Sequence, residues 1–277
     1  MFITNLIENI TENEKEIEQR IGRLRPSDLS NETIYKIISL LDLTSLSGTD
    51  TPKSIESLLF KAKHPVVNED VQTASVCIYQ PFIKQSVTSL RGTDIGIATV
   101  AGGFPAGQMS LDIKCADIEK SVSMGATEID VVISRTNPLT DNWKGLYDEV
   151  AAFKKSCSTS KLKVIIATGE LDDYSRIAKT SMVCLMAGAD FIKTSTGLEK
   201  VNATLEAGYV MMKAINSYFK ETGRKAGFKP AGGIRTTGQA LLWMQLVIEE
   251  LGDDWFHKPL FRFGASSLLD DLVHHLK

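Results

Sequence analysis

Residues 162–195 read LKVIIATGELDDYSRIAKTSMVCLMAGADFIKTS and contain one complete repeat of the pattern that decides the fold. Two short apolar runs, Leu162–Thr168 and Asp190–Ser195, enclose an amphipathic stretch over Tyr174–Ala187. Gly188 follows this stretch, where the end of a helix favours a residue that tolerates positive φ. The order strand, helix, strand predicts two parallel strands covered by a helix.

The same rhythm extends in both directions along the chain. The other apolar runs are Ser39–Thr44, Ser75–Tyr79, Ile95–Val100, Glu128–Ser134, Gly227–Ala231 and Leu260–Ala265. Amphipathic stretches between the runs predict further helices, at Ser110–Met124, Trp143–Cys157, Thr204–Lys220 and Gln239–Leu251. Eight runs favour an α/β fold of the closed (β/α)8 type, the TIM barrel, over an open doubly wound sheet.

The N-terminal residues 1–30 do not follow this repeat. Apolar residues from Ile3 to Leu24 recur at helical spacing, and Ser30 is a candidate N-cap for the next helix. We therefore expect two parts. Residues 1–30 form an extra helical segment packed on the barrel, as an appendage or across one end, and residues 31–277 form the catalytic barrel.

Composition disfavours several functional classes. The 277 residues carry 31 Lys and Arg against 34 Asp and Glu, a net charge of −3, which argues against a nucleic-acid or polybasic membrane surface. No apolar run approaches the ~18 residues of a membrane span, and the N-terminus lacks the features of a secretory signal. The four cysteines have no metal-binding spacing. We expect a cytoplasmic protein with no bound metal, no nucleic-acid partner and no membrane partner.

Four ionisable residues interrupt otherwise apolar runs. They are Asp130 in EIDVVIS, Lys163 in KLKVIIAT, Lys193 in DFIKTSTG and Lys229 in GFKPAGG. Burying an unpaired charge is costly, so these groups are expected to be paired or to take part in chemistry. If they face the barrel axis, they converge on its C-terminal mouth, where barrel enzymes have their active sites. The alternative is that each lysine forms a salt bridge or ends its strand at the surface.

Two neighbouring lysines suit Schiff-base chemistry. An ordinary lysine, with a pKa of about 10.4, is protonated near neutral pH and is a poor nucleophile. Burial and a second ammonium group both lower this pKa, so one lysine becomes able to attack a carbonyl. The resulting iminium accepts electrons from a breaking C–C bond, while Asp130 can transfer protons directly or through water. The pattern predicts a metal-independent aldol cleavage.

Glycine-rich loops after the last two runs are typical of a phosphate site. Ala231–Thr236 (AGGIRT) and Phe263–Leu269 (FGASSLL) let backbone N–H groups approach an anion, and the second loop places Ser266 and Ser267 at a helix start. The stretch Thr194–Gly197 (TSTG) can add further donors. Simple turns are the alternative for each loop.

Together these motifs resemble one family. DFIKTSTG, GFKPAGGIRT and FGASSLL, with LLDLTSL, VCIY, EIDVVI and KVIIATGEL, are similar to deoxyribose-phosphate aldolase, from about Leu40 to Leu269. The resemblance implies a (β/α)8 class I aldolase, a lyase that reversibly cleaves 2-deoxy-D-ribose 5-phosphate to D-glyceraldehyde 3-phosphate and acetaldehyde. It implies no metal or organic cofactor, and a homodimer is the expected assembly.

The resemblance also assigns roles to individual residues. Lys193 matches the Schiff-base lysine, Lys229 the lysine that lowers its pKa, and Asp130 the aspartate of the proton relay. Asp42 and Thr44 match positions on the side of the sugar hydroxyls, with Asp42 tied to Lys229. The remaining matches to substrate contacts, mainly to the phosphate, are Thr196, Gly197, Gly232, Gly233, Arg235, Gly264, Ser266 and Ser267.

Other positions are auxiliary or depart from the family. Lys163 matches a lysine near the site. Cys77 is either a small buried hydrophobic residue or a neighbour of the Lys193 pocket, open to alkylation by enals formed from acetaldehyde. Leu198 stands where members commonly have lysine, so phosphate binding is weaker or Lys200 supplies the charge. The chain ends in DLVHHLK, without the terminal tyrosine that assists proton transfer in some members.

Two other functions fit part of the pattern. Another Schiff-base phospho-sugar aldolase, or a transaldolase-like transferase, would differ in its acceptor. A non-catalytic barrel that binds phosphorylated sugars would have no need for the combination of Lys193, Lys229 and Asp130.

Overall fold

Eight parallel strands form the centre of the computed structural model, which describes residues 14–26, 29–171 and 173–276. The strands are β1 (Leu41–Thr44), β2 (Ser75–Ile78), β3 (Gly96–Ala101), β4 (Glu128–Val132), β5 (Lys161–Ile165), β6 (Phe191–Lys193), β7 (Gly227–Lys229) and β8 (Phe263–Ala265). They pair in the order β7-β6-β5-β4-β3-β2-β1-β8. Isolated bridges from Phe228 to Phe261 and from Ala231 to Gly264 join the two edges of the sheet. The strands therefore form the barrel that the eight runs predict.

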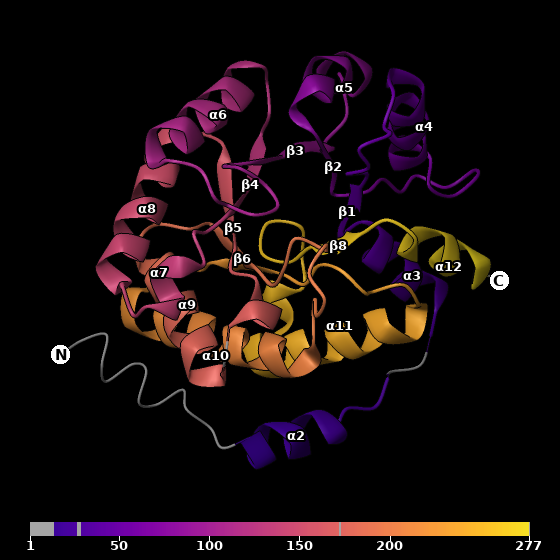
Figure 1. Ribbon diagram of the computed structural model, residues 1–277. Coiled ribbons are helices and arrows are strands. Elements are labelled where there is room, and N and C mark those ends of the chain that lie inside the picture. The colour runs from indigo at the N-terminus through magenta and orange to yellow at the C-terminus, as the bar shows by residue number, and fades with distance from the viewer. Residues whose placement is uncertain (1–13, 27–28, 172, 277) are drawn as a thin grey trace.

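Helices surround the barrel (Figure 1). They are α2 (Glu14–Gly22), α3 (Asn31–Ile38), α4 (Pro52–Lys63), α5 (Ile83–Ser89), α6 (Leu111–Ser123), α7 (Thr136–Leu139), α8 (Trp143–Ser156), α9 (Tyr174–Met186), α10 (Leu205–Thr222), α11 (Thr237–Leu251) and α12 (Leu268–His274), with short 3-10 turns at Gln80–Phe82, Thr168–Glu170 and Asp253–Trp255. The five helices expected from amphipathic spacing correspond to α6, α8, α9, α10 and α11. Ser30 caps α3 as expected, because its hydroxyl accepts from the Thr33 N–H at 3.1 Å.

The N-terminal helix α2 lies against α10. Ile17 is fully buried there, and the guanidinium of Arg20 forms ion pairs with Glu249 and Glu250 of α11.

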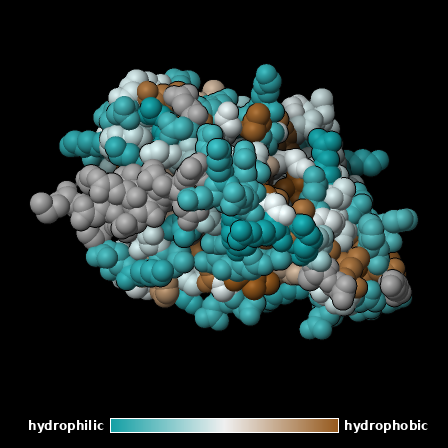
Figure 2. Space-filling view, turned by 90° about the horizontal axis from the view of Figure 1, so that it is seen from below, coloured by the Kyte–Doolittle hydropathy of each residue, from teal (hydrophilic) through white to brown (hydrophobic). Residues whose placement is uncertain are grey.

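The face of the molecule seen from below is mainly hydrophilic, with scattered apolar side chains (Figure 2). The helical spacing from Ile3 to Ile10 lies outside the described residues. Within the part of the chain that the structure describes, no helix is both long enough and apolar enough to span a bilayer.

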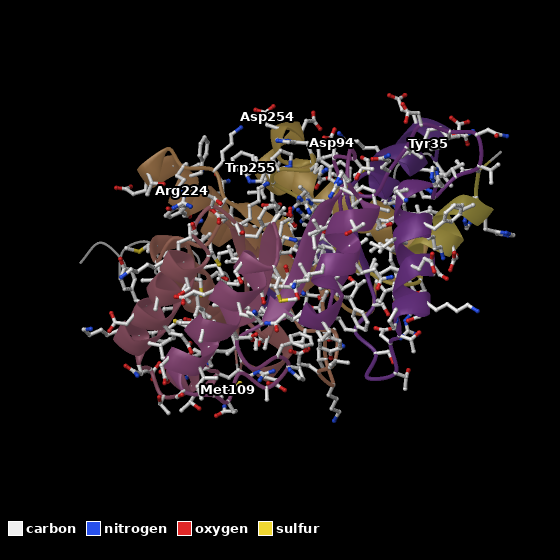
Figure 3. The ribbon with its side chains drawn as sticks, turned by 90° about the horizontal axis from the view of Figure 1, so that it is seen from above. Tyr35, Asp94, Met109, Arg224, Asp254 and Trp255 are labelled. Atoms are coloured by element: carbon white, nitrogen blue, oxygen red, sulfur yellow. The ribbon has the colours of Figure 1, made fainter. Side chains whose placement is uncertain are left out.

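The two ends of the barrel are distinct. Asp94 and Arg224, which precede β3 and β7, lie at one end of the molecule, and Met109, which follows β3, lies at the other (Figure 3). The carboxyl ends of the parallel strands thus face the Met109 end, where barrel chemistry is expected.

The inside of the barrel is divided between apolar and charged side chains. Cys77, Ala98 and Val100, from β2 and β3, form a small apolar cluster that also contacts Tyr79 and Phe104. Asp42, Asp130, Lys163, Lys193 and Lys229, from β1, β4, β5, β6 and β7, are also buried, and their charged groups contact one another. Because alternate residues of a strand face the same side, Glu128 and Asp130 of β4 both point toward this cluster.

Candidate active site

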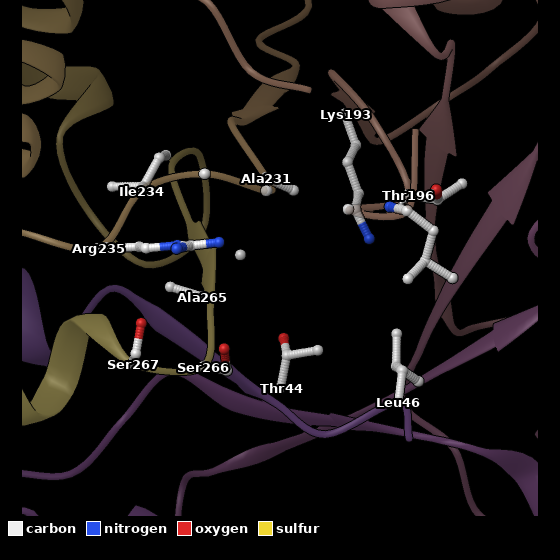
Figure 4. A pocket seen from close by; sticks show the side chains of 15 residues that line it. Thr44, Leu46, Lys193, Thr196, Ala231, Ile234, Arg235, Ala265, Ser266 and Ser267 are labelled. Atoms are coloured by element: carbon white, nitrogen blue, oxygen red, sulfur yellow. Dashed lines mark hydrogen bonds between the residues drawn. The ribbon is translucent and has the colours of Figure 1, made fainter. Parts of the chain in front are cut away.

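A cavity of about 250 Å³ opens at the carboxyl ends of the strands. Its lining comes from β1, β6 and β8 and from the loops that follow β1, β6, β7 and β8 (Figure 4). The structure brings together there Thr44, Lys193, Thr196, Gly197, Gly232, Gly233, Arg235, Gly264, Ser266 and Ser267, all of which were expected in the site. Leu46 and Leu198 add apolar surface to the lining.

Arg235 and the serine loop form one side of this cavity. In Figure 4 the Arg235 guanidinium lies on the same side as Ser266 and Ser267, while the Lys193 amine points into the cavity from the other side. Gly232 and Gly233 have φ values of 81° and 85°, which glycine adopts without strain. A Cβ on Gly232 would lie 2.8 Å from atoms of the Asn202 side chain, so this loop can take its path only with glycine. The arrangement offers a cation, two hydroxyls and accessible backbone to an anion.

The loop after β6 is held in place by Glu199. The buried Glu199 carboxylate accepts hydrogen bonds from the Thr196 N–H, at 3.0 Å, and from the Thr196 hydroxyl, at 2.6 Å. The Thr196 hydroxyl in turn accepts from the Leu198 N–H at 3.1 Å. Leu198 itself is 60% exposed. The loop therefore presents a fixed backbone and an apolar side chain to the cavity.

Lys193 connects the cavity with the charged interior. It ends β6, is only 3% exposed, and its Nζ lies 2.7 Å from Asp130 Oδ2. Burial is the main cause that lowers the pKa of the Lys193 amine below the ordinary 10.5. The ammonium of Lys229 acts in the same direction, and Asp130 opposes both. The result is a lysine with an increased share of the nucleophilic free amine.

Lys229 and Lys163, in contrast to Lys193, have raised pKa values. The Nζ of Lys229 lies 2.5 Å from Asp42 Oδ2 and 2.7 Å from Asp130 Oδ2. Burial alone would lower the pKa of Lys229, but these two carboxylates raise it above the ordinary value. Lys163 lies 2.5 Å from both Asp42 and Glu128, and its pKa is raised for the same reason. Both lysines remain ammonium groups at neutral pH.

Sequence reasoning missed two members of this interior cluster, Arg262 and Glu128. Arg262, 1% exposed, donates to Asp42 Oδ1 at 2.6 Å and forms a two-point contact with Glu128, at 3.0 and 2.7 Å. The two-residue period of a strand could have indicated both residues. Glu128 lies two positions before Asp130 and Arg262 two positions before Gly264, and residues at this spacing face the same side of a strand. The buried carboxylate of Glu199 was also missed.

The remaining expected residues lie deeper in the barrel or outside the cavity. Asp42 is fully buried below the cavity lining and accepts from Lys163, Lys229 and Arg262. Lys163 is likewise fully buried and lies 3.4 Å from Asp130 Oδ1. Lys200 is exposed and does not line the cavity.

Cys77 is fully buried on β2, with its Sγ 4.0 Å from Asp130 Oδ2. Burial, and secondly the charge of Asp130, raise the pKa of the Cys77 thiol. The thiol is therefore close to the catalytic candidates but protonated. Its alkylation stays a prediction.

Asp42, Glu128 and Asp130 converge, but basic side chains occupy the space between them. Among the described residues, no group of His, Cys, Asp and Glu side chains is placed to hold a metal ion. Among the described residues, no group donates a hydrogen bond to Asp130 Oδ1, although the Nζ of Lys163 lies 3.4 Å away. Burial alone would raise the pKa of the Asp130 carboxyl, but the charges of Lys163, Lys193 and Lys229 hold it well below the ordinary 3.8.

Comparison with known proteins shows the family and the fold. The family model described as DeoC/LacD family aldolase matches residues 36–274. The chain is 49% identical over 259 residues to the deoxyribose-phosphate aldolase of Mus musculus, covering 88% of this chain and 81% of that protein. It is 47% identical over 260 residues to the deoxyribose-phosphate aldolase of Homo sapiens, with the same coverage. The fold is similar to that of the tetrameric deoxyribose phosphate aldolase from Aeropyrum pernix, with a TM-score of 0.69 and 22% identity over 95% of this chain and 97% of that chain.

Proposed function

Because the chain belongs to the DeoC/LacD family of aldolases, we propose that it is a deoxyribose-phosphate aldolase. It reversibly cleaves 2-deoxy-D-ribose 5-phosphate to D-glyceraldehyde 3-phosphate and acetaldehyde. The observation that carries the assignment of residues is that Lys193 both lines the cavity and contacts the buried charge cluster. No metal ion or organic cofactor is required by this chemistry.

Lys193 acts as the nucleophile in this proposal. Its free amine adds to the C1 aldehyde carbon of the open-chain sugar, and loss of water gives an iminium. The C2–C3 bond then breaks: its electron pair moves to form the enamine, and the C3 hydroxyl loses its proton as C3 becomes the aldehyde carbon of glyceraldehyde 3-phosphate. Protonation of C2 and hydrolysis of the iminium release acetaldehyde and restore the amine.

Asp130 transfers the protons of this sequence. Its Oδ2 accepts hydrogen bonds from the Lys193 amine and the Lys229 ammonium, whereas its Oδ1 accepts none from the described residues and lies 3.4 Å from the Lys163 Nζ. Oδ1 can therefore take the C3 hydroxyl proton, directly or through a water molecule, and return it at C2. Lys229 stays cationic and opposes protonation of Lys193. Thr44, at the edge of the cavity, faces the sugar hydroxyls.

The substrate phosphate lies in the half of the cavity formed by Arg235, Ser266 and Ser267, with the glycine loops beside it. This location is supported by the hydroxyl and guanidinium groups there and by the distance of the acidic cluster, whose carboxylates are buried deeper. Leu198 contributes no charge, so Arg235 is the principal cation for the phosphate.

We predict that Arg235→Ala raises KM for 2-deoxyribose 5-phosphate about tenfold, because a charge-assisted contact to the phosphate is lost. Cleavage of non-phosphorylated 2-deoxyribose should not change. Lys200→Ala is the matched control, since it removes a nearby exposed cation that does not line the cavity. Steady-state kinetics with both sugars check this. Equal losses on the two sugars, or a larger effect of Lys200→Ala, would contradict it.

Reductive trapping tests the function as a whole. Borohydride reduction in the presence of acetaldehyde should leave a stable ethyl group on Lys193, located by peptide mapping. Coupled assays should show cleavage of 2-deoxyribose 5-phosphate in preference to ketose phosphates. Trapping at another lysine, or a preference for ketose phosphates, would replace this proposal with another Schiff-base aldolase or transaldolase.

We also propose a biological setting and a partition of the chain. The enzyme is cytoplasmic and acts in deoxyribonucleotide and carbohydrate catabolism, a setting supported by four free cysteines. It assembles as a homodimer. Residues 1–30 form a helical segment packed on the barrel, supported by the burial of Ile17, and residues 31–277 form the catalytic unit.

A further inference from the structure

The buried cluster contains more cations than anions. Its carboxylates are Asp42, Glu128 and Asp130, and its basic groups are Lys163, Lys193, Lys229 and Arg262, all at most 4% exposed. Three carboxylates can balance three cations. Because isolated charges are strongly disfavoured in a protein interior, one basic group should be neutral.

The contacts identify which group this is. Lys163 contacts three carboxylates, and Lys229 and Arg262 contact two each. Among the residues that the structure describes, the only carboxylate in contact with Lys193 is that of Asp130, through an oxygen that Lys193 shares with Lys229. Lys193 is thus the least stabilised cation, and any change in the number of charges around it should alter its protonation first.

Glu128 and Arg262 take part in this balance without touching the cavity. They contact each other at 2.7 Å, and each reaches the rest of the cluster through Lys163 or Asp42. Resting on the proposed function, we propose that Glu128 and Arg262 are positioning residues that keep the Lys193 amine neutral by fixing the number of charges in the barrel interior. Their role is electrostatic and acts at a distance from the reacting atoms.

Other titratable groups also lie near the cluster. The groups that face it from the surrounding elements are Asp42 on β1, Cys77 on β2, Glu128 and Asp130 on β4, Lys161 and Lys163 on β5, Lys193 on β6, Lys229 on β7, and Lys258 and Arg262 before β8. Cys77 stays a neutral thiol because burial raises its pKa. Lys161 and Lys258 are only half buried, so solvent screens them.

The proposal predicts shifts of opposite sign for two substitutions. Glu128→Gln removes a negative charge, so the Lys193 ammonium is less stabilised and the free amine persists to lower pH. Arg262→Met removes a positive charge, so Lys193 takes up a proton in compensation and the free amine appears only at higher pH. Each shift should be about one pH unit, a tenfold change in the ratio of amine to ammonium.

The experiment is the pH dependence of borohydride trapping of acetaldehyde on Lys193, followed by intact mass from pH 5 to 10. The variants are Glu128→Gln, Arg262→Met, the conservative Arg262→Lys and the double variant Glu128→Gln with Arg262→Met. The trapping midpoint should fall for the first, rise for the second, and return to the wild-type value for Arg262→Lys. The double variant should also return to the wild-type midpoint, because it restores the number of charges although it disrupts packing twice.

Glu149→Gln is the matched control. It breaks a second buried ion pair, between Glu149 and Lys114 at 2.8 Å, that lies outside the barrel interior. The trapping midpoint of this variant should not move.

If wild-type Lys193 is not trapped at all, the proposed function itself fails. If Lys193 is trapped but the two single variants shift in the same direction or not at all, or the double variant shifts further than either, the proposed role of Glu128 and Arg262 is wrong. If Arg262→Met does not fold, the proposal is tested by Glu128→Gln alone, whose trapping midpoint must fall below the wild-type value.

Discussion

Lys193→Ala is expected to lower kcat/KM for 2-deoxyribose 5-phosphate by about 10,000-fold or more. The substitution removes the atom that forms the iminium, and the other buried lysines cannot replace it. Lys163 and Lys229 remain ammonium groups because carboxylates surround them. A coupled assay for glyceraldehyde 3-phosphate measures the loss.

The fold should survive this substitution. Asp130 keeps Lys229 as an ion-pair partner at 2.7 Å, so no carboxylate is left unpaired. Circular dichroism and the thermal midpoint test this point. Lys225→Ala, which removes an exposed lysine before β7, is the control and should retain wild-type turnover. Turnover near the wild-type value in Lys193→Ala would refute the catalytic assignment.

Lys229→Leu is expected to move the reactive range of Lys193 to higher pH. Without Lys229, only Lys163 and Arg262 remain as fixed cations against three carboxylates, so Lys193 is stabilised as ammonium. An amine reacts only above its pKa, and a raised pKa therefore shifts the rising limb of the pH–rate profile upward. A shift of one to two units would reduce activity at pH 7 by about tenfold to a hundredfold.

The pH dependence of kcat/KM and of borohydride trapping measures this shift. Lys114→Met provides a control, because it also removes a buried lysine from its carboxylate, Glu149, but outside the barrel interior. Restoration of the Lys229→Leu rate at high pH would support the electrostatic role. A rate that stays low at every pH, with an unchanged midpoint, would show that Lys229 acts in some other way.

Much of the fold is legible in the sequence because strands buried on both faces leave continuous apolar runs. Each of the eight runs overlaps one strand, although most strands are shorter than their runs, and β6, β7 and β8 have only three residues each. The helix α4 was not predicted, yet its start was marked: Thr51 and Ser54 form a capping box, and Pro52 occupies the first helical turn. Its outer face explains the omission, since Phe60 is 64% exposed and blurs the amphipathic pattern.

The residues of the candidate site could be predicted from the sequence only in part. Lys193 and Lys229 stand out because a lysine interrupts an apolar run next to a glycine-rich loop. Glu128 and Arg262 do not, because one begins a strand and the other precedes one, where charge is common. Their contact joins positions 134 residues apart, on strand β4 and just before strand β8, and depends on the curvature that brings these distant strands across the barrel from each other. Sequence alone does not specify which inward positions share a level along the barrel axis.

The burial of the charge cluster separates the two halves of the active site in their response to dissolved ions. Mobile counterions cannot enter the barrel interior, so the electric field acting on the Lys193 amine should be nearly independent of ionic strength. Arg235 is exposed to solvent, and its attraction for a dianionic phosphate is screened as salt is added. Concentrated saline surroundings would therefore weaken capture of the sugar while leaving its conversion, once bound, unaltered.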